Sequence, residues 1–320
     1  MSFEIIDLHC DTIMDCHFNG VKLKDREGHI NIEKLRQGNC MAQALALFIP
    51  TDGKVGRDGI TLPWDIYKGM LSSWKENVDA NSDSIRPAYS ASDIEKNAAD
   101  GYMSALLTVE DGIGIDDKMQ RLEEMYDDGV RMLTLTWNWE NCIGYPNSSD
   151  SDEHSKGLKP FGFGVVERMN ELGMVIDVSH LSEGGFWDVA TASKYPFVAS
   201  HSCARKLHDH QRNLTDKQLR ALADHGGVVG INFCSAFLSD DLRNSYAEDV
   251  IKHMLHFKDV CGVDSIAWGS DFDGIESNLD FKDYTGMPRL VQMLEKYFTD
   301  DEIDKINHGN ALRVFKDSMK

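Results

Sequence analysis

Two side chains of types that commonly bind metal ions follow the first apolar segment of the chain. Residues 3–8 read Phe-Glu-Ile-Ile-Asp-Leu, and His9 and Asp11 come directly after them. Residues two apart in a strand point to the same side, so His9 and Asp11 can reach one cation together. The pair alone is equally typical of a hydrogen-bonded His and Asp at the start of a loop. Ligand residues elsewhere in the chain must decide between the two interpretations.

Later apolar segments also end in residues of metal-ligand types. Glu110 ends residues 102–110, His180 follows 174–179, His201 follows 197–200 and Asp271 follows 265–270. One histidine at a strand end is usually a structural, hydrogen-bonded residue, but several at equivalent positions favour a single site. Three imidazoles with carboxylates suit zinc or another divalent transition metal better than magnesium or calcium, which prefer oxygen ligands.

The sequence leaves the roles of other polar residues near these segments open. Asp7 and Asp177 either orient ligand histidines as hydrogen-bond acceptors or cap loops. His17, His29 and His154 lie in loops and stay open as ligands, although none of them ends a strand. The other histidines, in helices or polar connections, are interpreted as surface or structural residues.

Eight apolar segments of strand length alternate with helical patterns along the whole chain. The expected strands are 3–8, 41–49, 102–110, 131–137, 174–179, 197–200, 227–233 and 265–270. This alternation predicts an α/β fold with a parallel sheet, and eight units indicate a closed (β/α)₈ TIM-like barrel. Functional groups in such a barrel gather at the C-terminal ends of the strands, where we expect the metal site. No linker or shift in composition divides residues 1–320, so we expect a single domain.

Several connections carry local signals. The segment Ser92-Asp-Ile-Glu95 fits a capping box that would open a helix, and Thr215 with Gln218 fits another. A glycine-rich loop follows Pro50. The long polar segment 138–160 is typical of a lid or binding loop.

Composition excludes several classes of protein. The formal net charge is −20 in 320 residues, which disfavours binding to nucleic acid and to anionic membranes. No apolar run approaches the ~20 residues of a membrane span, and no secretory signal opens the sequence, so we expect a cytoplasmic protein. Seven widely spaced cysteines without a Cys-x-x-Cys pair indicate buried thiols rather than disulfides or a thiolate zinc site.

The motifs together resemble one known family over essentially the full chain. They include Asp7-Leu-His-Cys-Asp11, Ser200-His-Ser-Cys-Ala-Arg205, Arg212-Asn-Leu214 and Gly269-Ser-Asp-Phe-Asp-Gly274. The chain is similar to the membrane (renal) dipeptidases, a family of zinc dipeptidases among the amidohydrolase-like barrels. This resemblance implies a binuclear metallopeptidase that hydrolyses dipeptides.

The resemblance also assigns roles to individual residues. It implies that His9, Asp11 and Glu110 hold one Zn²⁺, that Glu110, His180 and His201 hold a second, and that Glu110 sets their separation. Two ions would lower the pKa of a water towards ~7 and polarise the scissile carbonyl. Asp271 would transfer the proton of the attacking water or contact the substrate amine. Arg212 would pair with the C-terminal carboxylate of the dipeptide, which suits its planar fork of donors.

Two positions depart from the family pattern. Trp137 stands where vertebrate members carry a histidine that contacts the substrate, and Phe237 stands where a carboxylate-binding tyrosine is found. Trp137 is therefore a candidate substrate-binding residue, and the dipeptide preference stays open, including a D-residue at the C-terminal position. The alternatives are a related amidohydrolase such as an N-acyl amino acid deacylase, and a non-catalytic metal-dependent binding protein. The sequence is compatible with a homodimer.

Overall fold

Eight parallel strands close into a barrel in the computed structural model, which describes residues 5–50 and 62–320. The barrel strands are β1 (Ile5–Asp7), β2 (Cys40–Phe48), β4 (Met103–Glu110), β5 (Met132–Thr134), β6 (Val175–Asp177), β7 (Val198–Ser202), β8 (Val228–Ile231) and β10 (Ile266–Trp268). They pair in the order β2-β1-β10-β8-β7-β6-β5-β4, and β2 pairs with β4 from Ala42 and Ser104 to Phe48 and Glu110. The predicted (β/α)₈ barrel and its eight strands are confirmed. The predicted start of the first strand at residues 3–4 and the glycine-rich loop after Pro50 lie outside the described residues.

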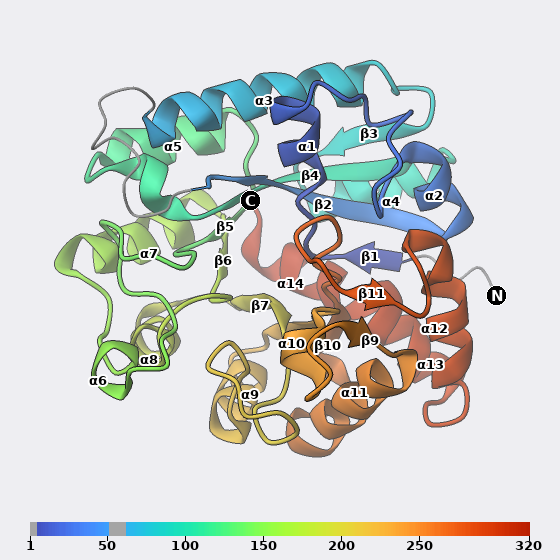
Figure 1. Ribbon diagram of the computed structural model, residues 1–320. Helices are drawn as coiled ribbons and strands as arrows, with labels where there is room; N and C mark the ends of the chain where they lie inside the picture. Colours follow the sequence, from blue (N-terminus) through green and yellow to red (C-terminus); the bar gives the residue numbers. More distant parts are fainter. Residues whose placement is uncertain (1–4, 51–61) are drawn as a thin grey trace.

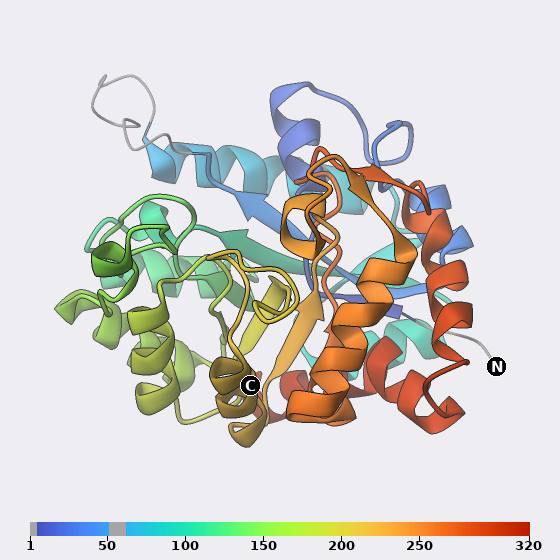
Figure 2. The same ribbon diagram turned by 60° about the horizontal axis from the view of Figure 1, so that its bottom comes forward.

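Helices lie around the outside of these strands (Figure 1 and Figure 2). They are α1 (Thr12–Phe18), α2 (Ile32–Gln37), α3 (Pro63–Asp79), α4 (Ala91–Ala99), α5 (Met119–Asp127), α6 (Ser151–His154), α7 (Pro160–Leu172), α8 (Glu183–Ala192), α9 (Asp216–Asp224), α10 (Ser235–Leu238), α11 (Ala247–Cys261), α12 (Met287–Leu294), α13 (Asp300–Asp304) and α14 (Asn310–Ser318). Short 3-10 turns cover Gly112–Ile115, Val263–Ser265 and Tyr284–Gly286, and a π-helical segment, Lys305–Gly309, joins α13 to α14.

Two details differ from the sequence predictions. The capping box at Ser92 is wrong, because α4 begins at Ala91 and its N-cap is Ser90, whose extended backbone lets the side chain accept from the Asp93 N–H. The box formed by Thr215 and Gln218 is confirmed. Three short strands were not predicted: β3 (Ile85–Ala88) pairs with the start of β4, and β9 (Asn244–Ser245) pairs with β11 (Asn278–Leu279).

The barrel interior changes from apolar to polar along the strands. One buried cluster takes a residue from each barrel strand and packs them with α14: Ile6, Ala42, Leu106, Met132, Val175, Val198, Val228, Ala267 and Phe315. Two residues further on, and so on the same face, stand the buried polar side chains of Thr108, Thr134, Asp177 and Ser200. The apolar layer closes the N-terminal end of the barrel, and the polar layer supports the chemistry expected at the other end.

All seven cysteines are free thiols, as the sequence predicts. Within residues 5–50 and 62–320, no helix has both the length and the apolar character needed to cross a bilayer.

Candidate metal centre

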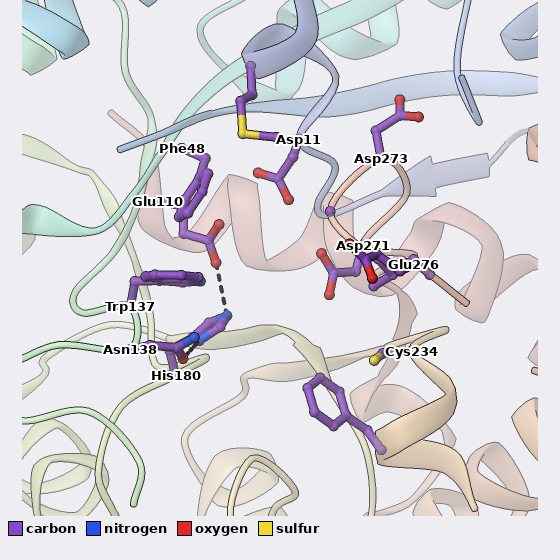
Figure 3. A pocket seen from close by; sticks show the side chains of 14 residues that line it. Asp11, Phe48, Glu110, Trp137, Asn138, His180, Cys234, Asp271, Asp273 and Glu276 are labelled. Atoms are coloured by element: carbon purple, nitrogen blue, oxygen red, sulfur yellow. Dashed lines mark hydrogen bonds and ion pairs between the residues drawn. The ribbon is translucent and has the colours of Figure 1, made fainter. Parts of the chain in front are cut away.

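The predicted ligand residues come together at the C-terminal end of the barrel. His9 and Asp11 follow β1, Glu110 is the last residue of β4, His180 follows β6, His201 lies in β7 and Asp271 follows β10. All six side chains are buried, with at most 8% of the residue exposed. Five strands therefore deliver imidazoles and carboxylates to one place. Figure 3 shows Asp11, Glu110, His180 and Asp271 of this group.

Glu110 lies between two groups of ligands. Its Oε2 is 3.6 Å from His9 Nε2, which is in turn 3.5 Å from Asp11 Oδ2. Its Oε1 is 2.9 Å from His180 Nε2 and 3.4 Å from His201 Nε2. Each carboxylate oxygen thus faces a different set, and both His9–Asp11–Glu110 and Glu110–His180–His201 bring their ligand atoms close enough to hold a cation.

The other ring nitrogens of two histidines have hydrogen-bond partners that fix their protonation. His180 Nδ1 lies 3.2 Å from Asn138 Oδ1, an amide oxygen that can only accept, so Nδ1 carries the proton. Ser200 Oγ donates to Asp177 Oδ2 at 2.6 Å and therefore accepts from His201 Nδ1 at 2.7 Å. Both Nε2 atoms are then left with lone pairs, 3.0 Å apart. Two facing lone pairs are the arrangement of metal ligands rather than of a hydrogen-bonded pair.

The electrostatics of the centre also fit bound cations. Burial, reinforced by the charge of Asp11, raises the pKa of Glu110 to about 8, and burial raises the pKa of Asp271 to about 6. Burial opposes protonation of His9, but Asp11 and Glu110 outweigh it and raise the His9 pKa well above its usual value. His9 Nε2 and Asp11 Oδ1 are buried without a hydrogen-bond partner. Carboxylates and imidazoles crowded in this way need positive charge among them, which divalent metal ions supply.

Burial also keeps the remaining histidines of the centre neutral. It lowers the pKa of His180 well below the usual value, and the nearby positive charges of Arg212 and His9 add to the effect. The pKa of His201 is lowered for the same reasons, with burial again the largest cause. Neutral imidazole is the form that binds a metal ion, so the surroundings favour the ligand state of both rings.

Backbone geometry at the centre is unusual. His180 and Asp271 have φ values of 67° and 60°, in the left-handed region that non-glycine residues rarely adopt. The turn at His180 is held from the 138–160 segment, because Asn147 donates to the His180 carbonyl from its backbone N–H at 2.7 Å and from its side chain at 3.1 Å. Such strain is maintained only where surrounding contacts enforce it, and it is common at functional sites.

A cavity of about 370 Å³ opens beside the ligands. Its further walls come from strand ends, loops and short helices of the same barrel end: Met14, Phe48, Trp137, Asn138, Cys234, Phe237, Asp273, Gly274, Ile275 and Glu276. The Trp137 ring packs edge-on against Phe48 at 4.8 Å and lies 6.3 Å from the His180 ring. Trp137 therefore forms part of the wall next to the ligands, where the sequence suggested a substrate contact (Figure 3).

Arg212 is buried behind the cavity wall. Its guanidinium donates to the His201 carbonyl at 3.2 Å and lies 5.2 Å from the centre of the Phe237 ring. Burial lowers its pKa, although Asp271 and Glu110 favour the charged form. Nε has no hydrogen-bond partner, and among the described residues the guanidinium makes no ion pair. A buried cation that has no direct ion-pair partner is suited to receive an anionic group.

The other sequence candidates are placed as follows. Asp177 supports His201 through Ser200, whereas Asp7 accepts from the Ser270 backbone and hydroxyl and from the His9 backbone rather than orienting a ring. His17, His29 and His154 contact Ser73, Asp273 and Arg205 respectively, away from the ligand groups.

Several residues of the site were not predicted from the sequence. Asn138 holds His180, and Asn232 donates to Asp271 Oδ2 at 2.8 Å. Both stand at or just beyond strand ends, so applying the strand-end rule to amides as well as to acids and histidines would have found them. Cys234 and Glu276 line the cavity from later loops, and their spacing carries no comparable signal.

Comparison with known sequences identifies the family of this chain and a similar protein within the curated sequences. The model of the membrane dipeptidase family, peptidase family M19, matches residues 1–320. A Klebsiella pneumoniae protein described as an uncharacterised protein in the pqqA 5′ region is 37% identical over 264 residues, which are 79% of this chain and 96% of that protein.

Solved structures show the same architecture. A metallopeptidase of family M19 described as the dipeptidase AC superposes with a TM-score of 0.90 and 26% identity, covering 99% of both chains. A Rhodobacter sphaeroides metallopeptidase, solved with a phosphinate mimic of the dipeptide L-Ala-D-Ala, also gives a TM-score of 0.90, with 25% identity over 99% of this chain and all of that one.

Proposed function

The chain belongs to the membrane dipeptidase family and is a metal-dependent dipeptidase, and from this premise we propose that it is a binuclear zinc enzyme in which the two ligand groups around Glu110 hold one ion each. His9, Asp11 and Glu110 would form the first set, and Glu110, His180 and His201 the second. The bound ions would lower the pKa of a water and polarise the scissile carbonyl. Zinc is favoured by the mixture of imidazole and carboxylate ligands, although other divalent transition metals suit them too.

The observation that carries this proposal is the position of Glu110. Its two oxygens face different histidines, Oε2 towards His9 and Oε1 towards His180 and His201. A carboxylate that served a single ion would have no reason to lie centrally between two sets of ligand atoms. Glu110 is therefore assigned as the bridging residue of the catalytic centre.

Asp271 is proposed as the group that moves the proton. Asn232 holds its Oδ2, while Oδ1 lies 3.9 Å from His9 Nε2 on the side of the ligands. Its pKa is raised towards neutrality by burial, which suits a carboxylate that takes a proton from water and returns it to the leaving amine. Asp271 also lines the cavity, so the substrate can reach it.

Arg212 is proposed to receive the C-terminal carboxylate of the dipeptide. Its unpaired Nε and the absence of an ion-pair partner among the described residues leave donors free for a bidentate contact. The ring of Phe237 would hold the Arg212 guanidinium by a cation–π contact, at the position where other family members carry a carboxylate-binding tyrosine. Trp137 and Phe48 would contact the side chains of the substrate on the other side of the cavity.

We extend the proposal to dipeptides with a D-residue at the C-terminal position. The support is that the Rhodobacter sphaeroides enzyme binds a mimic of L-Ala-D-Ala and shares this fold along its whole length. A panel of dipeptides that varies both residues and both chiralities, read by ninhydrin or mass spectrometry, tests this. Metal analysis of the same preparation should give about two ions per chain. One ion or none with full activity would contradict the binuclear centre.

The two alternatives make different predictions in the same panel. An N-acyl amino acid deacylase would hydrolyse the N-acetylated dipeptide as well as the free one. A metal-dependent binding protein would bind dipeptides without turnover, but the retention of every ligand type and of Arg212 speaks against a decayed site. One domain over residues 1–320, a cytoplasmic location and a homodimer stay as proposals, tested by limited proteolysis, cell fractionation and sedimentation velocity.

A further inference from the structure

Arg205 makes a set of contacts that the chemistry of the metal centre does not explain. Its Nε donates to the carbonyl of Asn213 at 2.9 Å, and one of its terminal nitrogens donates to the carbonyl of Gln211 at 3.1 Å. These two residues are the immediate neighbours of Arg212. The guanidinium of Arg205 thus bonds the backbone on both sides of the residue proposed to receive the substrate carboxylate.

The base of the same loop is closed by the backbone. Arg205 N–H donates to the Leu214 carbonyl at 2.8 Å, and Leu214 N–H donates to the Cys203 carbonyl at 2.9 Å. Residues 205–214 therefore form a loop whose ends are joined and whose far side is tied to the Arg205 side chain. The loop has no helix or strand of its own, so its shape depends on hydrogen bonds such as these and those of the Asn213 side chain to the carbonyls of His208 and Phe237.

Arg212 needs such support because its own position is unfavourable. It is a cation with 6% of its surface exposed and without an ion-pair partner among the described residues. Burial of an unpaired charge is costly, so a loosely held loop would turn this side chain towards water before the substrate arrives. A loop held at residues 211 and 213 keeps the guanidinium in place instead.

The Arg205 guanidinium also joins the loop to its surroundings. One of its terminal nitrogens lies 3.2 Å from Glu183 Oε2 at the start of α8, and the other lies 3.2 Å from His154 Nε2. Glu183 balances the positive charge of Arg205, so this pair adds no net charge beside Arg212. His154 belongs to the 138–160 segment, whose first residue, Asn138, holds the metal-ligand candidate His180.

From these contacts we infer that Arg205 is a positioning residue that holds the loop 205–214 so that Arg212 is ready to bind the carboxylate of the dipeptide. This inference rests on the proposed role of Arg212. It predicts that removal of Arg205 acts on recognition of the carboxylate and spares the metal ions, because Arg205 contacts none of their proposed ligands.

The test compares hydrolysis of a free dipeptide with hydrolysis of its C-terminal amide. The probe is the better substrate of L-Ala-L-Ala and L-Ala-D-Ala, and the readout is the ratio of kcat/KM for the acid to that for the amide. We expect Arg205→Ala to lower this ratio about 10-fold, mainly through a higher KM for the acid, since uniform binding is lost. Metal content should stay at the wild-type level.

Arg131 offers a matched control. Its guanidinium also bonds backbone carbonyls, those of Tyr89, Tyr126 and Val130, but it precedes β5 and so lies at the opposite end of the barrel. Arg131→Ala should destabilise the fold to a similar degree and leave the acid-to-amide ratio unchanged. If Arg205→Ala does not fold, Arg205→Lys gives the same test, because a lysine keeps the charge beside Glu183 but cannot reproduce the fork of donors.

A double variant separates positioning from an independent effect. The acid-to-amide ratio of the double variant Arg205→Ala, Arg212→Ala should equal that of Arg212→Ala alone, since Arg205 acts only through Arg212. If the wild type prefers the acid and the Arg205 variants prefer it equally, Arg205 is not a positioning residue, and the role of Arg212 is unaffected. If the wild type hydrolyses the acid and the amide equally well, Arg212 is not a carboxylate receptor and the role inferred for Arg205 falls with it.

Discussion

Gly274 lies so close to two carboxylates of the centre that a single methyl group should disturb them. A Cβ added at this position would stand 2.0 Å from Asp11 Oδ2 and 2.6 Å from Asp271 Oδ1. Contacts of a real Cβ below 3.0 Å are essentially never seen, so the Asp11 oxygen must retreat from 2.0 Å to at least 3.0 Å. The backbone itself does not resist the change, because the φ of Gly274 is not in the left-handed region.

The expected effect of Gly274→Ala follows from this displacement. Asp11 is short and buried, so its oxygen can withdraw only by leaving the place where the His9 and Glu110 atoms converge. A shift of ~1 Å in a catalytic constellation costs about 100-fold in rate. We therefore expect kcat/KM to fall about 100-fold, with loss of the ion proposed at His9, Asp11 and Glu110 and retention of the ion at His180 and His201.

Metal analysis after dialysis, combined with dipeptide hydrolysis, is the assay. Gly164→Ala is the control, because its Cβ would meet only Met119 Cε at 3.5 Å, and alanine is favoured over glycine within helix α7 by about 1 kcal/mol. That variant should keep both ions and full activity. If Gly274→Ala also keeps both ions and wild-type kcat/KM, the lack of space beside Asp11 does not affect metal binding or catalysis, which contradicts this prediction.

Three further predictions follow from other parts of the structure. Arg212→Ala should remove roughly 2 to 4 kcal/mol of transition-state stabilisation, which lowers kcat/KM for dipeptides about 30- to 1000-fold, and should not change metal content. An effect under about 3-fold in steady-state assays would argue against a carboxylate receptor. Glu110→Gln should weaken both ion sites, whereas His180→Ala should weaken only its own, so equal loss of both ions in the two variants, measured by metal analysis, would contradict the ligand sets. Burial lowers the pKa of His253 to about 4, so the unfolded chain takes up the proton first and stability falls as the pH drops from about 6.5 towards 4. Denaturant unfolding of the wild type should lose about 2 kcal/mol more between pH 7 and pH 5 than His253→Gln does, and parallel pH profiles would exclude this histidine as the cause.

Much of the fold could be predicted because its signals are local. Each barrel strand is a short buried apolar segment, and each was recognised from its own residues, from β1 to β10. The capping box at Thr215 involves residues three apart, which the sequence also displays directly. The strands β9 and β11 were missed because each has two residues and exists only through pairing with the other.

The metal-ligand candidates were predictable for a geometric reason. Parallel strands that close into a barrel bring their C-terminal ends to one rim, so residues such as Glu110 and His201 must converge whatever the loops do. The spacing of residues could not predict that the two oxygens of Glu110 face different histidines. The resemblance to the family supplied the bridging role, and the distances in the structure support it.

The sequence by itself determined the barrel, the rim on which chemistry is placed and the residue types that meet there, because periodicity and strand ends are properties of consecutive residues. Only the tertiary structure decided that Asn138 and Ser200 set the protonation of two imidazoles, that Gly274 leaves no room for a Cβ beside Asp11, and that Arg205 bonds the backbone on both sides of Arg212. The contact of Ser200 depends on the pairing of β7 with β6, and the other three depend on the path of a loop. Loop paths are fixed by bonds to segments far away in the chain, which no local pattern records.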